Sequence, residues 1–239
     1  MKRAARGTDH TRNLLTSLML VFPLLVAYHA GVMLTGGLLN GADFVTQIMI
    51  SVFGREHYWI FVVVVTAGFL VALALLRRKQ HFHPRTVVPL LLESTIYALT
   101  MGGLISLVMI RFLHIDPPRM TAAAAKAGGP LTNLVMSFGA GVYEETVFRL
   151  GLLGGLVALF ERVMGMRRFV AVVLGLGLSS AAFSAVHHLG PLGDPLAVWI
   201  FVFRMLAGVL FGLLFWFRGF AVAVYTHAIY DVIVLVFRH

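Results

Sequence analysis

The chain contains no cysteine, and only 12% of its 239 residues are charged. The absence of cysteine excludes a disulfide framework, a thiol nucleophile and a zinc site with cysteine ligands. The shortage of charge excludes a soluble enzyme, because soluble domains carry about 25% charged residues. A disordered protein is excluded as well, since 59% of the residues are apolar.

Long apolar runs take the place of the missing charge, and the mean hydropathy is +0.91. A transmembrane helix needs about 20 mostly apolar residues to cross about 30 Å of hydrocarbon. The runs predict an all-α, polytopic transmembrane helix bundle of about seven spans (six to eight), with short interfacial helices such as one at residues 44–53. We expect residues 1–239 to form a single integral-membrane domain. The expected spans are Leu14–Leu39, Tyr58–Leu76, Val87–Phe112, Leu131–Phe160, Phe169–His188, Leu196–Phe217 and Phe220–Phe237.

The basic residues between these spans predict an orientation. The N-terminal tail, residues 77–85, residues 161–168 and Arg218 together hold twelve Lys and Arg, against five on the opposite side. Cytoplasmic loops are enriched in Lys and Arg, so the N-terminus is expected in the cytoplasm of a bacterial or archaeal cell, with the chain in the plasma membrane. This distribution explains the net charge of +9 without a nucleic-acid partner.

Several ionisable residues lie inside the expected spans, where lipid would exclude them. One charge at the bilayer centre costs about 2.5–3.5 kcal/mol, so six would cost roughly 15–20 kcal/mol if they faced lipid. These residues must therefore face the bundle interior, and most lie in the second half of the chain. They are Glu93, Glu144, Glu145, Arg149, His187, Arg204, His227 and Asp231.

Helical spacing divides these residues into pairs that share a helix face. Residues four apart lie one above the other on a helix. Adjacent residues are rotated by about 100°, so Glu144 is expected to point away from Glu145, toward neighbouring helices. The pairs four apart are Glu145 with Arg149, Phe183 with His187, and His227 with Asp231.

The chemistry of this set favours hydrolysis of an amide by water. A carboxylate in a partly dry cavity is a competent general base near neutral pH, which suits Glu144. The imidazole of His187 can hold the same water. His227 and Asp231, on a third helix, can stabilise the oxyanion of an attacked carbonyl.

Three motifs in this order resemble the CPBP family, which comprises type II CAAX prenyl endopeptidases and bacteriocin-processing (Abi) membrane proteins. They are E-E-x-x-x-R at 144–149, F-x-x-x-H at 183–187 and H-x-x-x-D at 227–231. The resemblance covers residues 130–235, the expected catalytic core. It implies a glutamic intramembrane protease that cleaves a membrane-anchored protein or peptide in the lipid bilayer.

The resemblance also implies residue roles. Glu144 corresponds to the base that activates water, His187 helps to hold that water, and His227 with Asp231 corresponds to the oxyanion-stabilising pair. Glu145, Arg149 and Phe183 would support them. The usual family residue at the last position is Asn. Asp231 must therefore either be protonated, in order to donate a hydrogen bond, or orient His227 instead.

Other readings of the same residues remain open. No cofactor is expected, although two histidines and two carboxylates are also a zinc ligand set. A proton-coupled transporter, or a non-catalytic membrane scaffold or immunity protein, would use the same interior polar groups. Glu93 is left outside the site, either lining a water-accessible cavity or lying near the interface, and Arg204 is assigned to a structural role. Because His187 falls near the outer end of its span and Glu144 near mid-membrane, we expect the site in the outer half.

Overall fold

The computed structural model describes residues 13–35, 50, 52, 54–116, 129–189 and 193–237. Within them the chain forms helices and no strands, which confirms the all-α prediction. The expected interfacial segment at 44–53 and the end of the first span at Leu39 lie largely outside the described residues.

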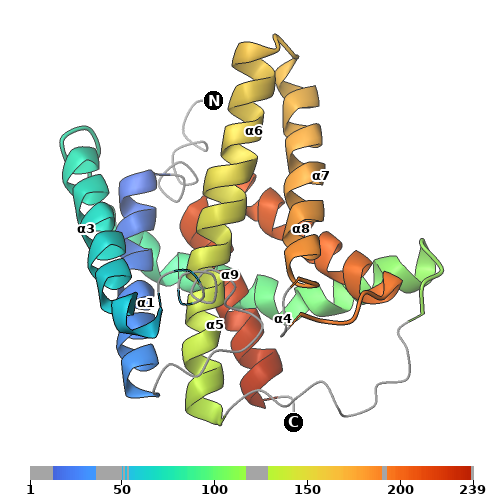
Figure 1. Ribbon diagram of the computed structural model, residues 1–239. Helices are drawn as coiled ribbons and strands as arrows, with labels where there is room; N and C mark the ends of the chain where they lie inside the picture. Colours follow the sequence, from blue (N-terminus) through green and yellow to red (C-terminus); the bar gives the residue numbers. More distant parts are fainter. Residues whose placement is uncertain are drawn as a thin grey trace.

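Six of the described helices are long and apolar enough to cross a membrane, which confirms a polytopic bundle (Figure 1). Each corresponds to one expected span. They are α1 (Leu14–Leu34), α3 (Tyr58–Arg77), α4 (Val87–Arg111, preceded by the turn Pro84–Thr86), α7 (Arg168–Val186), α8 (Val198–Arg218) and α9 (Phe220–Val232, continued by the π-helical end Ile233–Phe237).

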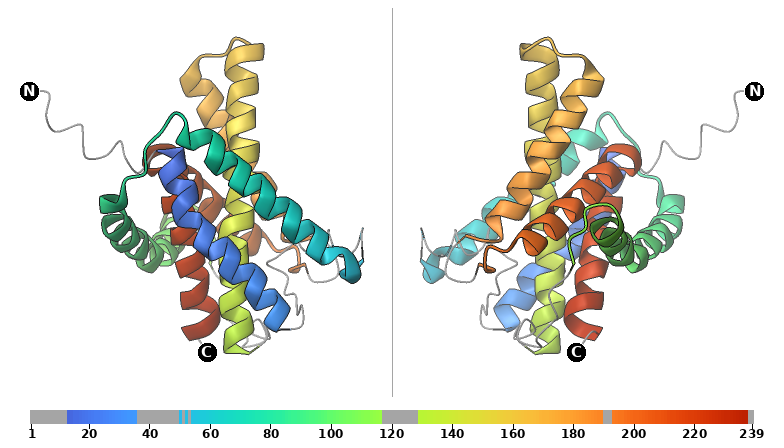
Figure 2. Two further views of the ribbon diagram at one scale, coloured as in Figure 1. Left: turned by 90° about the vertical axis from the view of Figure 1, so that its left-hand side faces the viewer. Right: turned by 90° about the vertical axis from the view of Figure 1, so that its right-hand side faces the viewer.

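The remaining expected span is one continuous helical run with two wide turns in it. The run consists of α5 (Pro130–Glu144), a π-helix (Glu145–Leu153), α6 (Gly154–Ala158) and a second π-helix (Leu159–Val163). At about 1.5 Å per residue it is longer than the hydrocarbon core. The tip where it turns back into α7 accordingly projects beyond the ends of α1, α8 and α9 (Figures 1 and 2).

The inner helices approach one another closely where glycine faces a neighbour. A Cβ atom on Gly141 would lie 2.9 Å from both the Cβ of Ala228 and the carbonyl oxygen of Val224. Only a residue without a side chain therefore allows α5 and α9 to pack this tightly. Gly219, at φ 103°, makes the sharp corner between α8 and α9.

The outer helices present apolar surface that suits lipid. No residue of α3 is buried, and Val64 and Val71 are 62% and 57% exposed. Helix α4 crosses the long α5–α6 run steeply, since it lies across the view in Figure 1 and is seen nearly end-on in Figure 2. Its buried face packs against α8 and α9, and its other face is exposed.

Candidate active site

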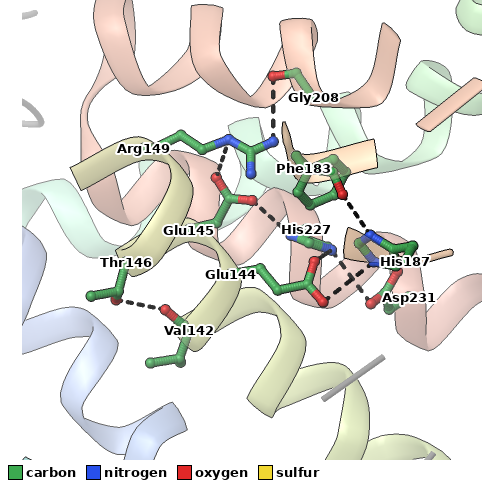
Figure 3. Close-up of polar contacts among 10 residues, drawn as sticks. All are labelled: Val142, Glu144, Glu145, Thr146, Arg149, Phe183, His187, Gly208, His227 and Asp231. Atoms are coloured by element: carbon green, nitrogen blue, oxygen red, sulfur yellow. Dashed lines mark hydrogen bonds and ion pairs between the residues drawn. The ribbon is translucent and has the colours of Figure 1, made fainter. Parts of the chain in front are cut away.

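The side chains of the predicted site residues lie close together inside the bundle (Figure 3). Glu144 is the last residue of α5, Glu145 begins the π-helix, His187 follows α7, and His227 and Asp231 lie on α9. The first four of these side chains are buried, and the Asp231 side chain is 18% exposed. Asp231 therefore marks the side on which the cluster approaches the surface.

Glu144 and His187 lie at the same level because their two helices form a hairpin. Glu144 lies 19 residues before Val163, where the run ends, and His187 lies 19 residues after Arg168, where α7 begins. The arms are antiparallel and of equal length, so the two residues face each other. In the sequence, Glu144 falls near the middle of its span and His187 near the end of its own. This difference arises because the long run continues for a further 14 residues beyond Glu144, to Pro130.

The carboxylate of Glu144 faces an imidazole with each of its oxygens. Oε1 lies 3.5 Å from Nε2 of His187, and Oε2 lies 3.8 Å from Nε2 of His227. Neither oxygen makes a hydrogen bond to a described residue. An unsatisfied buried carboxylate is costly in free energy, so lone pairs left without a hydrogen bond point to a role in binding or chemistry.

The protonation pattern of His187 follows from its neighbours. Nδ1 lies 2.7 Å from the carbonyl oxygen of Phe183, which can only accept a hydrogen bond. Nδ1 therefore carries the hydrogen and donates it. In the neutral imidazole this leaves a lone pair on Nε2, directed at Glu144.

The contacts of His227 likewise place a ring hydrogen on Nδ1, which faces a carboxylate oxygen. Nδ1 lies 2.7 Å from Oε1 of Glu145, while Nε2 lies 3.5 Å from Oδ2 of Asp231 and 3.8 Å from Glu144. Glu144 was expected to point away from Glu145 toward neighbouring helices, and its oxygens do face residues of α7 and α9. Glu145 faces His227 as well, so the two carboxylates approach different nitrogens of one ring, at the point where the α-helix widens into the π-helix.

The predicted ion pair between Glu145 and Arg149 is present and fully enclosed. Oε2 of Glu145 lies 3.1 Å from Nε of Arg149, and both side chains are buried. Nη2 of Arg149 donates to the carbonyl oxygen of Gly208, and the guanidinium lies 4.3 Å from the ring centroid of Phe183. These contacts connect the π-helix to α7 and α8 and hold Glu145 in place for His227.

One aromatic residue beside the site was not predicted from the sequence. Phe211 of α8 stacks on His227, with ring centroids 4.4 Å apart and planes at 16°. Its position between Gly208 and Gly212 is the available sequence signal, because small residues in a span mark a close helix contact.

Glu93 and Arg204 form ion pairs with residues outside this cluster. Glu93 accepts from Arg218, with Oε1 2.5 Å from Nε, and so connects α4 to the end of α8. Arg204 pairs with Asp194, in the connection between α7 and α8. Each therefore has a partner that accounts for its charge.

No group of three or more His, Cys, Asp or Glu side chains in the described part of the chain is arranged to hold a metal ion. The absence of a cofactor remains a prediction.

Residues 127–233 match the family described as type II CAAX prenyl endopeptidase Rce1-like. This segment is similar to an Rce1-like domain. The match confirms the family resemblance that the three motifs predict, and it supports a CAAX-type membrane protease. No curated protein and no solved structure matches the chain. The Rce1-like segment includes α5 to α9 and every residue of the cluster, whereas α1, α3 and α4 precede it.

Proposed function

We propose that the protein is an intramembrane endopeptidase in which Glu144 activates water against a peptide bond of a membrane-anchored protein or peptide. The observation that carries the proposal is the position of Glu144. Its two oxygens make no hydrogen bond to a described residue and face the Nε2 atoms of two oriented histidines. The Rce1-like match supports the same class of reaction.

In this mechanism one water donates one hydrogen to Glu144 and the other to the lone pair on Nε2 of His187. The oxygen lone pair of the water is then free to attack the carbonyl carbon of the scissile amide. Glu144 takes a proton as the C–O bond forms, and it returns that proton to the amide nitrogen as the C–N bond breaks. A positioned general base of this kind contributes about 10²–10⁴-fold to the rate.

His227 serves the oxyanion when its Nε2 is protonated. The imidazolium then donates from Nδ1 to Glu145 and from Nε2 to the developing oxyanion. Asp231, 3.5 Å from the same Nε2, balances the charge of the imidazolium and orients the ring. In this role Asp231 need not donate a hydrogen bond itself.

The decisive experiment compares Glu144→Gln with Glu161→Gln, since Gln keeps the shape of Glu but cannot act as a base. Glu161 is a matched control because it lies on the projecting hairpin, away from the site. Peptide termini in membranes that contain each variant would be compared by mass spectrometry. We expect cleavage products with the wild type and Glu161→Gln, and none with Glu144→Gln at equal folded amounts.

Other results would overturn the proposal. Cleavage products at wild-type levels from Glu144→Gln would show that Glu144 is not the general base. Substrate flux in proteoliposomes, without any peptide product from the wild type, would identify a transporter instead. Loss of folding in Glu144→Gln, with no products from the wild type, would identify a structural role for the cluster.

A further inference from the structure

A second feature, separate from the cluster around Glu144, is an open cavity of about 300 Å³ between the helix ends. Its walls come from α1, the π-helix, the start of α7 and the corner between α8 and α9. The lining residues are Leu14, Ser17, Leu150, Arg168, Phe215, Trp216, Gly219 and Phe220.

The cavity lies at the ends of three helices that are long and apolar enough to cross a membrane. Leu14 is the first residue of α1, Trp216 lies in the last turn of α8, and Phe220 is the first residue of α9. Ends of transmembrane helices meet the headgroup layer, where Trp and basic residues are enriched. The projecting α6–α7 hairpin rises beside these ends (Figure 2), and Arg168 reaches the cavity from it.

The charge of the cavity is positive. Arg168 is the only charged residue among the lining residues, and its guanidinium carbon lies 5.7 Å from the ring centroid of Trp216. The carboxylate of Glu161 is 4.0 Å away and both side chains are solvent-accessible, so this contact neutralises Arg168 weakly. The first turn of α7 contains no acidic residue, so its N-terminus adds further positive potential.

We propose that this cavity binds the phosphate headgroup of an anionic phospholipid, with Arg168 as the phosphate ligand. The apolar walls, which include Leu14, Leu150 and Phe215, would contact the first methylene groups of the acyl chains. The volume suits a headgroup and the nearest carbons, while the rest of each chain extends into the bilayer. Basic pockets between transmembrane helices recognise lipid headgroups in this way.

The test is a lipid titration of the purified full chain in neutral detergent, followed by native mass spectrometry. The probes are phosphatidylglycerol, phosphatidylcholine with the same acyl chains, and glycerol phosphate. We expect phosphatidylglycerol to bind at least tenfold more tightly than phosphatidylcholine, and glycerol phosphate not to compete. Arg168→Gln should remove most of the preference, whereas Arg162→Gln, which deletes the same charge from the same hairpin, should preserve it.

A second variant separates the cavity from its charge. Leu14→Trp fills the cavity and leaves Arg168 in place, so it should also reduce phosphatidylglycerol binding about tenfold. Equal binding of the two lipids to the wild type would overturn the proposal. If Arg162→Gln and Arg168→Gln lose the preference for phosphatidylglycerol equally, the preference comes from the general surface charge and not from this cavity. Competition by glycerol phosphate would identify a free-phosphate site instead.

Discussion

Oε1 of Glu145 lies 2.7 Å from Nδ1 of His227. The carboxylate of Glu145 also pairs with Arg149, so it accepts from Nδ1 of His227, while Nε2 of the same ring faces Glu144. Glu145 thus acts through His227, as a positioning residue that orients the ring and stabilises its positive charge when Nε2 is protonated.

Glu145→Gln is expected to lower the rate of cleavage by roughly 10²–10³-fold, because the neutral Gln amide stabilises the protonated His227 ring, the proposed oxyanion donor, less than the carboxylate does. The ring would then be neutral, and a neutral ring is a weaker donor to the oxyanion than the imidazolium. The ¹⁵N chemical shifts of His227 would report this change directly, with the exposed Glu56→Gln as control. Loss of activity without any change in the shifts would contradict the positioning role.

Gly141→Ala is expected to destabilise the protein by about 1–3 kcal/mol, because the added methyl group collides with α9. Gly155 provides a control on the same helical run, since a Cβ there meets nothing within 4 Å. Thermal unfolding in detergent should show a lower midpoint for Gly141→Ala and an unchanged or higher one for Gly155→Ala. Equal shifts in both variants would mean that the α5–α9 contact is not specially tight.

Arg149→Met is expected to cost about 3–5 kcal/mol of stability, because it leaves the buried charge of Glu145 without a partner. The exposed pair of Glu161 with Arg168 provides the comparison, and Glu161→Gln should cost about 1 kcal/mol or less. Chemical unfolding in mixed micelles would measure both free energies. If Arg149→Met unfolds like the wild type, the pair contributes nothing to the fold.

Asp231→Asn is expected to retain cleavage within about tenfold of the wild type, since the amide keeps an oxygen near His227 and adds a donor for the oxyanion. Asp231→Leu removes both and is expected to lose about 10²–10³-fold. Rates with one purified substrate would be compared at equal folded enzyme. A greater loss for Asn than for Leu would show that a polar group at this position does not assist His227 or the oxyanion.

The orientation can be tested by labelling, because the chain has no cysteine of its own. Glu56→Cys and Lys79→Cys place single thiols at opposite ends of α3, on exposed residues. With the N-terminus in the cytoplasm, a membrane-impermeant maleimide should label Cys at position 56 in intact cells and Cys at position 79 only after permeabilisation. The reverse pattern would invert the predicted topology.

The contacts of the site that lie within a single helix could be predicted from the sequence. The buried pair of Glu145 with Arg149 follows from their spacing of four residues. The sequence also predicts which ionisable residues face the interior, because placing a charge in lipid is costly whichever helix lies next to it. The convergence of Glu144 and Glu145 on His227 was not predicted, because it depends on how α9 packs against α5 and the π-helix.

Hydropathy and spacing along the chain thus determined the helical class, the spans and which side chains must turn inward, since each depends on about 20 neighbouring residues. Only the tertiary structure decided which inward side chains meet. The hairpin brings Glu144 level with His187, Gly141 lets α9 approach, and Phe211 stacks on His227 from a separate helix. The first two of these relations join residues more than 40 positions apart, and all three depend on crossing angles and rotations that interhelical packing sets.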